Sequence, residues 1–184
     1  MCELIVAGYP DVLRAAQVAT ELHRMDRRWS DELEHAITVA VRDDGRLLVQ
    51  QTIDPAAGDS AAWSGLWAAL IRDTLMVTAT EGIAAAAMAA QQVAAGVPPG
   101  STRTDAPPPR PSWWTEEIGL PTEFVRDVGA LIGRGESALF VLLWKMEPSP
   151  AIRQLRRLGG TVVHCLLDET QDEKLRSVLA GSAA

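Results

Sequence analysis

The chain has 184 residues, of which 47% are hydrophobic, and a formal net charge of −7 at pH 7. A chain of this length can bury a full core, and one domain with a large insertion is the expected organisation. The negative charge disfavours binding to nucleic acid and electrostatic docking on anionic lipid. The two cysteines, Cys2 and Cys165, lie far apart, so neither a disulfide scaffold nor a metal site is expected from them.

Residues 1–58 predict the first half of an α+β domain. Residues 3–8 are an apolar run typical of a buried strand, and Asp11 follows in a position to cap a helix. In this helix apolar residues recur at helical spacing: Val12, Ala15, Ala16, Ala19, Leu22 and Met25. Residues 36–42 and 47–53 flank the turn Asp43-Asp44-Gly45, which indicates a β-hairpin.

Residues 59–96 are an apolar insert and predict two helices. The first carries large apolar residues on one face, namely Trp63, Leu66, Trp67, Leu70 and Val77. The second is mostly alanine and includes Met88. A membrane span needs about 20 mostly apolar residues, and three charges interrupt the run: Arg72, Asp73 and Glu81. We therefore expect a helical hairpin that packs against protein rather than one that spans a membrane.

Residues 97–115 are a proline-rich arm that ends in Trp113 and Trp114. Proline favours extended backbone geometry, and adjacent exposed tryptophans usually find an apolar surface. Two interpretations stay open, a flexible tether and a stiff arm laid against a neighbouring subunit. The tryptophans favour the second.

Residues 116–184 predict the second half of the domain. Thr122 is placed to cap a helix, and residues 138–144 are a continuous apolar run typical of a central strand covered on both faces. Three further elements complete the chain: a helix after Pro150, a strand over residues 161–167 and a helix over residues 169–179. We expect an α+β fold with a ferredoxin-like β-α-β-β-α-β core, an extra C-terminal helix-strand-helix, and the inserted apolar helical hairpin.

Four segments from the two halves carry a family resemblance: ELIVAGYPD, VAVRDDGRLLVQQT, FVRDVGALIGRGESALFVLLWK and LRRLGGTVV. They are similar to the DUF1269 family, bacterial and archaeal proteins of uncharacterised function that are often labelled membrane proteins. The resemblance implies an apolar hairpin whose start resembles Trp63-Ser64-Gly65-Leu66-Trp67, and it supplies no catalytic residue. Relatives keep a glycine-rich hairpin where this chain has charges and the proline-rich arm, which argues against the membrane label.

No pattern in the sequence predicts an enzyme, a cofactor or a metal. Gly133-Arg134-Gly135 precedes a strand rather than a helix, so a turn is favoured over a phosphate-binding loop. His164 and Cys165 are adjacent in a strand and point to opposite faces, and Cys165 is interpreted as a small buried apolar residue. The three histidines show no mutual ligand spacing.

Three functions are compatible with the sequence, in a definite order. The first is a non-catalytic structural or assembly protein, a homo-oligomer or a subunit of a larger complex, that uses the insert and the arm. The second is membrane association through the same hairpin. The third is the binding of an apolar small molecule in a pocket lined by Trp63, Trp67 and Met88.

The expected interaction residues are apolar and belong to the insert and the arm: Trp63, Leu66, Trp67, Leu70, Met88, Trp113 and Trp114. The chain starts without a basic region ahead of its first apolar run, so no secretory signal is expected. A cytoplasmic location, with membrane association as the alternative, is the resulting expectation.

Overall fold

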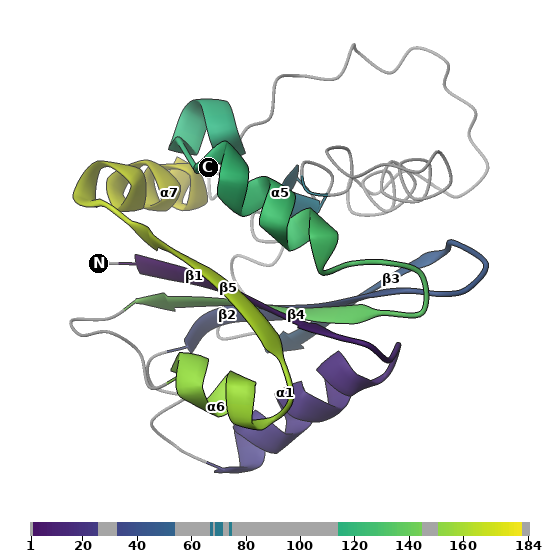
Figure 1. Cartoon of the computed structure of the whole chain (residues 1–184). Coiled ribbons are helices and arrows are strands. Elements are labelled where there is room, and N and C mark those ends of the chain that lie inside the picture. Colours follow the sequence, from purple (N-terminus) through teal and green to yellow (C-terminus); the bar gives the residue numbers. More distant parts are fainter. Residues whose placement is uncertain are drawn as a thin grey trace.

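The computed structural model describes residues 2–25, 33–53, 67, 69–71, 74, 114–144 and 151–181. These residues form a five-stranded antiparallel sheet with helices on both faces (Figure 1). The strands are β1 (Cys2–Tyr9), β2 (Leu33–Val41), β3 (Leu47–Ile53), β4 (Ser137–Trp144) and β5 (Thr161–Leu167). The helices are α1 (Arg14–Met25), the π-helix η1 (Trp114–Ile118), α5 (Thr122–Ala130), α6 (Ala151–Arg157) and α7 (Glu169–Gly181). The predicted α+β class is confirmed.

The strand order is β3-β2-β4-β1-β5, and every neighbouring pair is antiparallel. Strands β1 and β2 are consecutive in the sequence and are connected by α1, yet β4 lies between them in the sheet. In the same way, β4 and β5 are consecutive in the sequence and are connected by α6, and β1 lies between them in the sheet. The predicted β-α-β-β-α-β core included β3. In the observed sheet, β3 is an edge strand and β4 is the central strand. Strand β4 is continuously apolar from Ala138 to Trp144, which favours a position where both faces of the strand are covered, whereas β3 contains Gln50 and Gln51.

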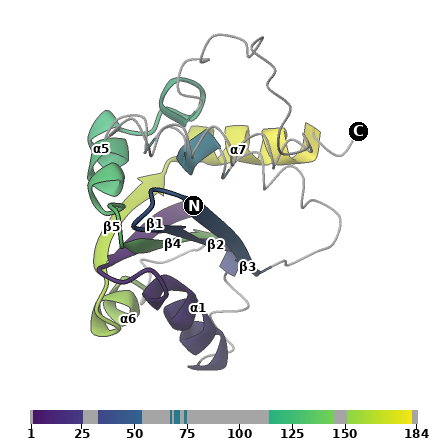
Figure 2. The same cartoon turned by 90° about the vertical axis from the view of Figure 1, so that its right-hand side faces the viewer.

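Side chains alternate along β1 and β4 and divide the core into two clusters. On one face, Leu4 and Phe140 belong to a cluster that includes buried residues of α5, η1 and α7. On the other face, Ile5 and Val141 pack with buried residues of α1 and α6. Figures 1 and 2 show these two helical layers on opposite sides of the sheet, here called the α5/α7 face and the α1/α6 face. The prediction that β4 is covered on both faces is confirmed.

Most predicted turns and caps are also confirmed. The Leu13 N–H donates to Asp11 Oδ1 at 2.8 Å ahead of α1. Gly45 in the β2–β3 turn and Gly159 after α6 have φ values of 79° and 89°, which favour glycine. The predicted cap at Thr122 is wrong, because Pro121 takes the N-cap position of α5 and no side chain caps the helix. Thr122 itself lies inside the first turn.

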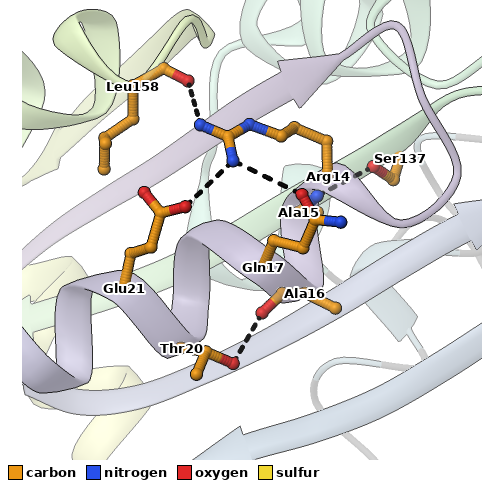
Figure 3. A network of polar contacts seen from close by, with 8 residues as sticks. All are labelled: Arg14, Ala15, Ala16, Gln17, Thr20, Glu21, Ser137 and Leu158. Carbon is orange, nitrogen blue, oxygen red and sulfur yellow. Dashed lines mark hydrogen bonds and ion pairs between the residues drawn. The ribbon is translucent and has the colours of Figure 1, made fainter.

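The start of α1 is fixed to distant parts of the chain by polar contacts (Figure 3). The Ala15 N–H donates to Ser137 Oγ at 3.1 Å. The Arg14 guanidinium donates to the Leu158 carbonyl at 3.2 Å and pairs with Glu21 at 3.0 Å. Because Ser137 begins β4 and Leu158 follows α6, these contacts join the N-terminal helix to the C-terminal half.

Tyr9, at the end of β1, has a buried hydroxyl without a hydrogen-bond partner in the described part of the chain. The hydroxyl packs against Gly160, where a Cβ atom would lie 3.0 Å from the oxygen. Burial raises the pKa of Tyr9 from its ordinary 10.0 to about 12, and the nearby Arg14 guanidinium offsets only part of this effect.

Tyr9 is the only tyrosine of the chain, so its ionisation can be followed directly by phenolate absorbance. We predict a pKa of about 12 in the folded protein and the ordinary value in urea. Because the folded state holds the proton more tightly, this contribution to stability is complete below the ordinary pKa and is lost as the pH rises through the folded pKa. A folded protein that titrates at the ordinary value would contradict the burial.

The Tyr9→Phe variant removes the unsatisfied hydroxyl and keeps the ring. We expect it to raise the free energy of unfolding at neutral pH by about 1 kcal/mol and to abolish the alkaline loss. Urea unfolding at neutral and alkaline pH measures both effects. Destabilisation by Tyr9→Phe would show that the hydroxyl has a partner.

Candidate functional site

The candidate site is the α5/α7 face, which is packed by described residues of the insert, such as Trp67 and Leu70, and by Trp114 of the arm. Of the predicted interaction residues, Trp67, Leu70 and Trp114 are described, and all three are buried in the core cluster of this face. Residues 67, 69–71 and 74 are helical, in agreement with the first predicted helix of the insert. The remaining predicted interaction residues, Trp63, Leu66, Met88 and Trp113, and the second predicted helix lie outside the described residues.

Trp67 is held by a buried hydrogen bond to strand β2. Its indole Nε1–H donates to Nδ1 of His35 at 2.7 Å, and the two ring centroids are 5.7 Å apart. Its ring also meets Phe140 of β4 edge to face, with centroids 6.0 Å apart. Because Nδ1 accepts a hydrogen bond, His35 is neutral and carries its ring proton on Nε2. His35 was not among the predicted site residues, and it lies in β2 just before residues 36–42, the run that predicted this strand.

The residues after Trp67 continue this contact. Leu70 and Ile71 are buried in the same cluster, and Ala69 packs against it. The Thr74 side chain is buried, and its hydroxyl donates to the Ile71 carbonyl at 2.9 Å. This buried polar group therefore has a hydrogen-bond partner within the segment. The described residues of the insert therefore present an apolar surface to the sheet.

Trp114, at the end of the arm, packs into the same cluster. It begins η1 and is 1% exposed, as is Ile118 at the end of η1. The Trp114 carbonyl accepts from the Leu120 N–H at 2.8 Å. Of a flexible tether and a stiff arm laid against a neighbouring subunit, the sequence favoured the second, with Trp113 and Trp114 against that subunit's apolar surface. Instead, the apolar surface that covers Trp114 is the core of its own chain.

Side chains of helix α7 make hydrogen bonds to the end of the π-helix η1. Lys174 Nζ donates to the Glu117 carbonyl at 3.0 Å, and Gln171 Nε2 donates to the Gly119 carbonyl at 2.9 Å. These contacts satisfy carbonyls at the end of η1 that the helix leaves without internal partners. The π-helix η1, which follows the arm, is thus fixed by both burial and hydrogen bonds.

A further polar cluster, which the sequence did not predict, joins α7 to the end of β4. Trp144 Nε1 donates to Asp172 Oδ1 at 2.6 Å, and the Arg176 guanidinium lies 4.1 Å from the centroid of the Trp144 ring. Arg176 also pairs with Asp172 at 3.1 Å. Spacing along α7 could have suggested the Asp172–Arg176 pair, but the contact with Trp144 depends on the packing of α7.

The glycine turn before β4 offers no phosphate site. The Gly133 N–H donates to Glu136 Oε2 at 2.6 Å, and the Gly135 N–H donates to the Val41 carbonyl at 2.8 Å. Gly135 has a φ of 79°. These backbone donors are occupied by the chain itself, so the prediction of a turn is confirmed.

His164 and Cys165 lie on opposite faces of β5, as predicted. His164 Nδ1 is 3.1 Å from Oε1 of the buried Glu3, whereas Cys165 packs against the core of the α5/α7 face. Cys165 is only partly buried, contrary to its interpretation as a buried residue, because β5 is an edge strand. Burial nevertheless raises the pKa of the Cys165 thiol, which lowers the fraction of reactive thiolate.

Within the described residues, no group of three or more histidine, cysteine or acidic side chains is placed to hold a metal ion. The same part of the chain contains no helix with the length and apolar character needed to cross a membrane.

A double-mutant cycle tests the Trp67–His35 hydrogen bond. Trp67→Phe and His35→Phe are each expected to destabilise the domain, and the double variant to be more stable than the sum of the two losses implies. The coupling free energy should be about 1 kcal/mol, because a single mutation leaves one buried partner unsatisfied. Urea unfolding of the four proteins measures it, and strict additivity would contradict the contact.

Comparison with known proteins gave one result. No curated protein and no solved structure matches the chain. A family model described as "Protein of unknown function (DUF1269)" matches residues 113–180, a stretch that contains η1, α5, β4, α6, β5 and nearly all of α7. This match confirms, over residues 113–180, the resemblance to the DUF1269 family that the sequence indicated.

Proposed function

We propose that this protein is a non-catalytic assembly protein that self-associates through residues 75–113, the part of the insert and arm that lies between its anchors. The anchors are the described residues at the two ends, Trp67 and Leu70 before this segment and Trp114 and Ile118 after it. The observation that carries the proposal is that all four are buried in one core cluster on one face of the sheet.

Because the anchors are buried, the residues that stabilise the fold differ from the residues proposed to mediate association. Trp67, Leu70 and Trp114 are at most 3% exposed, so they stabilise this chain's own core. Self-association through the insert and the arm would then use the residues between them. That segment is rich in alanine and proline and contains two of the predicted interaction residues, Met88 and Trp113. Alanine-rich helices allow close packing with a neighbouring helix, which suits an assembly contact.

We also infer that the domain is ferredoxin-like. The support is the interleaving of two β-α-β units, β1-α1-β2 and β4-α6-β5, each with one strand of the other unit between its own strands. Both connecting helices lie on the α1/α6 face (Figure 2). Strand β3 and helices α5 and α7 are then additions, and the described residues of the insert lie on the face opposite the connecting helices.

The proposal is tested by replacing residues 76–112 with a short glycine-serine linker, which keeps both anchors. We expect this variant to fold, with circular dichroism and cooperative unfolding like those of the full chain. Light scattering over a range of concentrations should give a larger particle for the full chain than for the variant. Equal numbers of chains per particle at every concentration would contradict self-association through this segment.

A pair of point variants refines the test. Met88→Asp places a charge in the proposed contact and should reduce the particle mass of the full chain. The control is Leu13→Asp, because Leu13 is 63% exposed and lies outside both core clusters. Equal effects of the two variants would show that Met88 has no particular role.

A further inference from the structure

The two edges of the sheet differ in how they are protected. Unpaired edges invite pairing with another chain, and proteins usually protect them with charges, prolines or bulges. The β2–β3 ladder contains a register shift between Ala36 and Ile37, which is a bulge or irregularity next to one edge. The β1–β5 ladder is regular from Thr161 to Leu167. Strand β5, with the sequence TVVHCLL, has no proline and no acidic or basic residue apart from its histidine.

Strand β5 also leaves apolar surface exposed. Leu166 is 50% exposed, and Val162, Val163 and Cys165 are only partly buried. In the described part of the chain, β5 pairs only with β1. Figure 1 looks toward this edge, where β5 passes in front of the other strands, and Figure 2 shows β5 and β3 at opposite ends of the sheet. An additional strand beside β5 would cover these side chains.

Charges at the two ends of β5 favour one kind of partner. Arg156 and Arg157 precede the strand in the last turn of α6, and Asp168 and Glu169 follow it. All four residues are exposed. If a second copy of β5 ran antiparallel to the first, the basic end of each strand would lie near the acidic end of the other. A parallel arrangement would bring like charges together.

We propose that β5 pairs with β5 of a second copy of this chain, antiparallel and about a twofold axis at His164, so that one sheet continues through both copies. This register places Val162 opposite the partner's Leu166 and Val163 opposite the partner's Cys165. Apolar side chains therefore meet apolar side chains on both faces, as an isologous contact requires. The two His164 rings meet at the axis, each beside the Glu3 carboxylate of its own chain.

This contact is separate from self-association through residues 75–113, and its test uses a matched pair of edge variants. Leu166→Lys adds a charge to β5, and Leu48→Lys adds the same charge to β3, where Leu48 is 49% exposed. Both are made in the protein with the linker in place of residues 76–112 and in the full chain. For the linker protein, we expect light scattering to give two chains per particle, one chain after Leu166→Lys, and two chains after Leu48→Lys.

A linker protein that is monomeric at all concentrations would overturn the β5 contact, and so would dimers that survive Leu166→Lys. If the linker protein proves to be unfolded, the full chain provides the test, because Leu166→Lys must halve its particle mass and Leu48→Lys must leave it unchanged. If the β5 contact forms but residues 75–113 do not mediate association, the full chain and the linker protein will both be dimers.

Cross-linking tests the register. Under mild oxidation Val163→Cys should form a disulfide with the partner's Cys165 and give a covalent dimer on a non-reducing gel. Val162→Cys is the control, because its side chain points to the other face of the strand. Equal yields from the two variants would overturn the proposed pairing.

Charge exchange tests the orientation. Arg157→Glu should weaken the dimer, and addition of Glu169→Arg should restore it, because the pair then attracts with the signs reversed. If the double variant dimerises no better than Arg157→Glu alone, the antiparallel arrangement is overturned.

Discussion

The structure depends on the need to cover both faces of β4. From Ala138 to Leu143 this strand has no polar side chain, and it lies between β2 and β1. Its even-numbered residues face one helical layer and its odd-numbered residues face the other. Exposure of either face would cost roughly 25 cal/mol for each Å² of apolar surface. Helices α1 and α6 cover one face, while α5, α7, η1 and the described residues of the insert cover the other.

This requirement changes the interpretation of the insert. A segment of alanine and tryptophan invites the idea that its whole apolar surface is meant for a partner. Trp67 and Trp114 instead contribute to the same core as Phe140. The buried bond between Trp67 and His35 adds specificity, because an apolar replacement of either residue alone leaves a polar group without its partner. The described residues of the insert and the arm are therefore part of the domain core, and the proposed association through the insert and the arm concerns the residues between them.

Local features were well predicted from the sequence because local physics decides them. The β2–β3 turn at Gly45 and the end of α6 at Gly159 both require backbone geometry that favours glycine. The strand order was not predictable in the same way, since it depends on which strands need two covered faces. The roles of His35 and Asp172 were missed for a related reason. Each binds a tryptophan that is distant in sequence, and no spacing rule connects them.

The position of β4 between β1 and β2 also determines when the protein can fold during synthesis. The first 53 residues contain three strands, but β1 has neither of its sheet neighbours until residues 137–167 have been made. Only the β2–β3 hairpin can pair earlier, and an isolated hairpin is marginally stable in water. A nascent chain that has just emerged from the ribosome therefore carries unpaired apolar strand surface while the insert is translated. Chaperones that shield such surface would act on this protein before its last strands are complete.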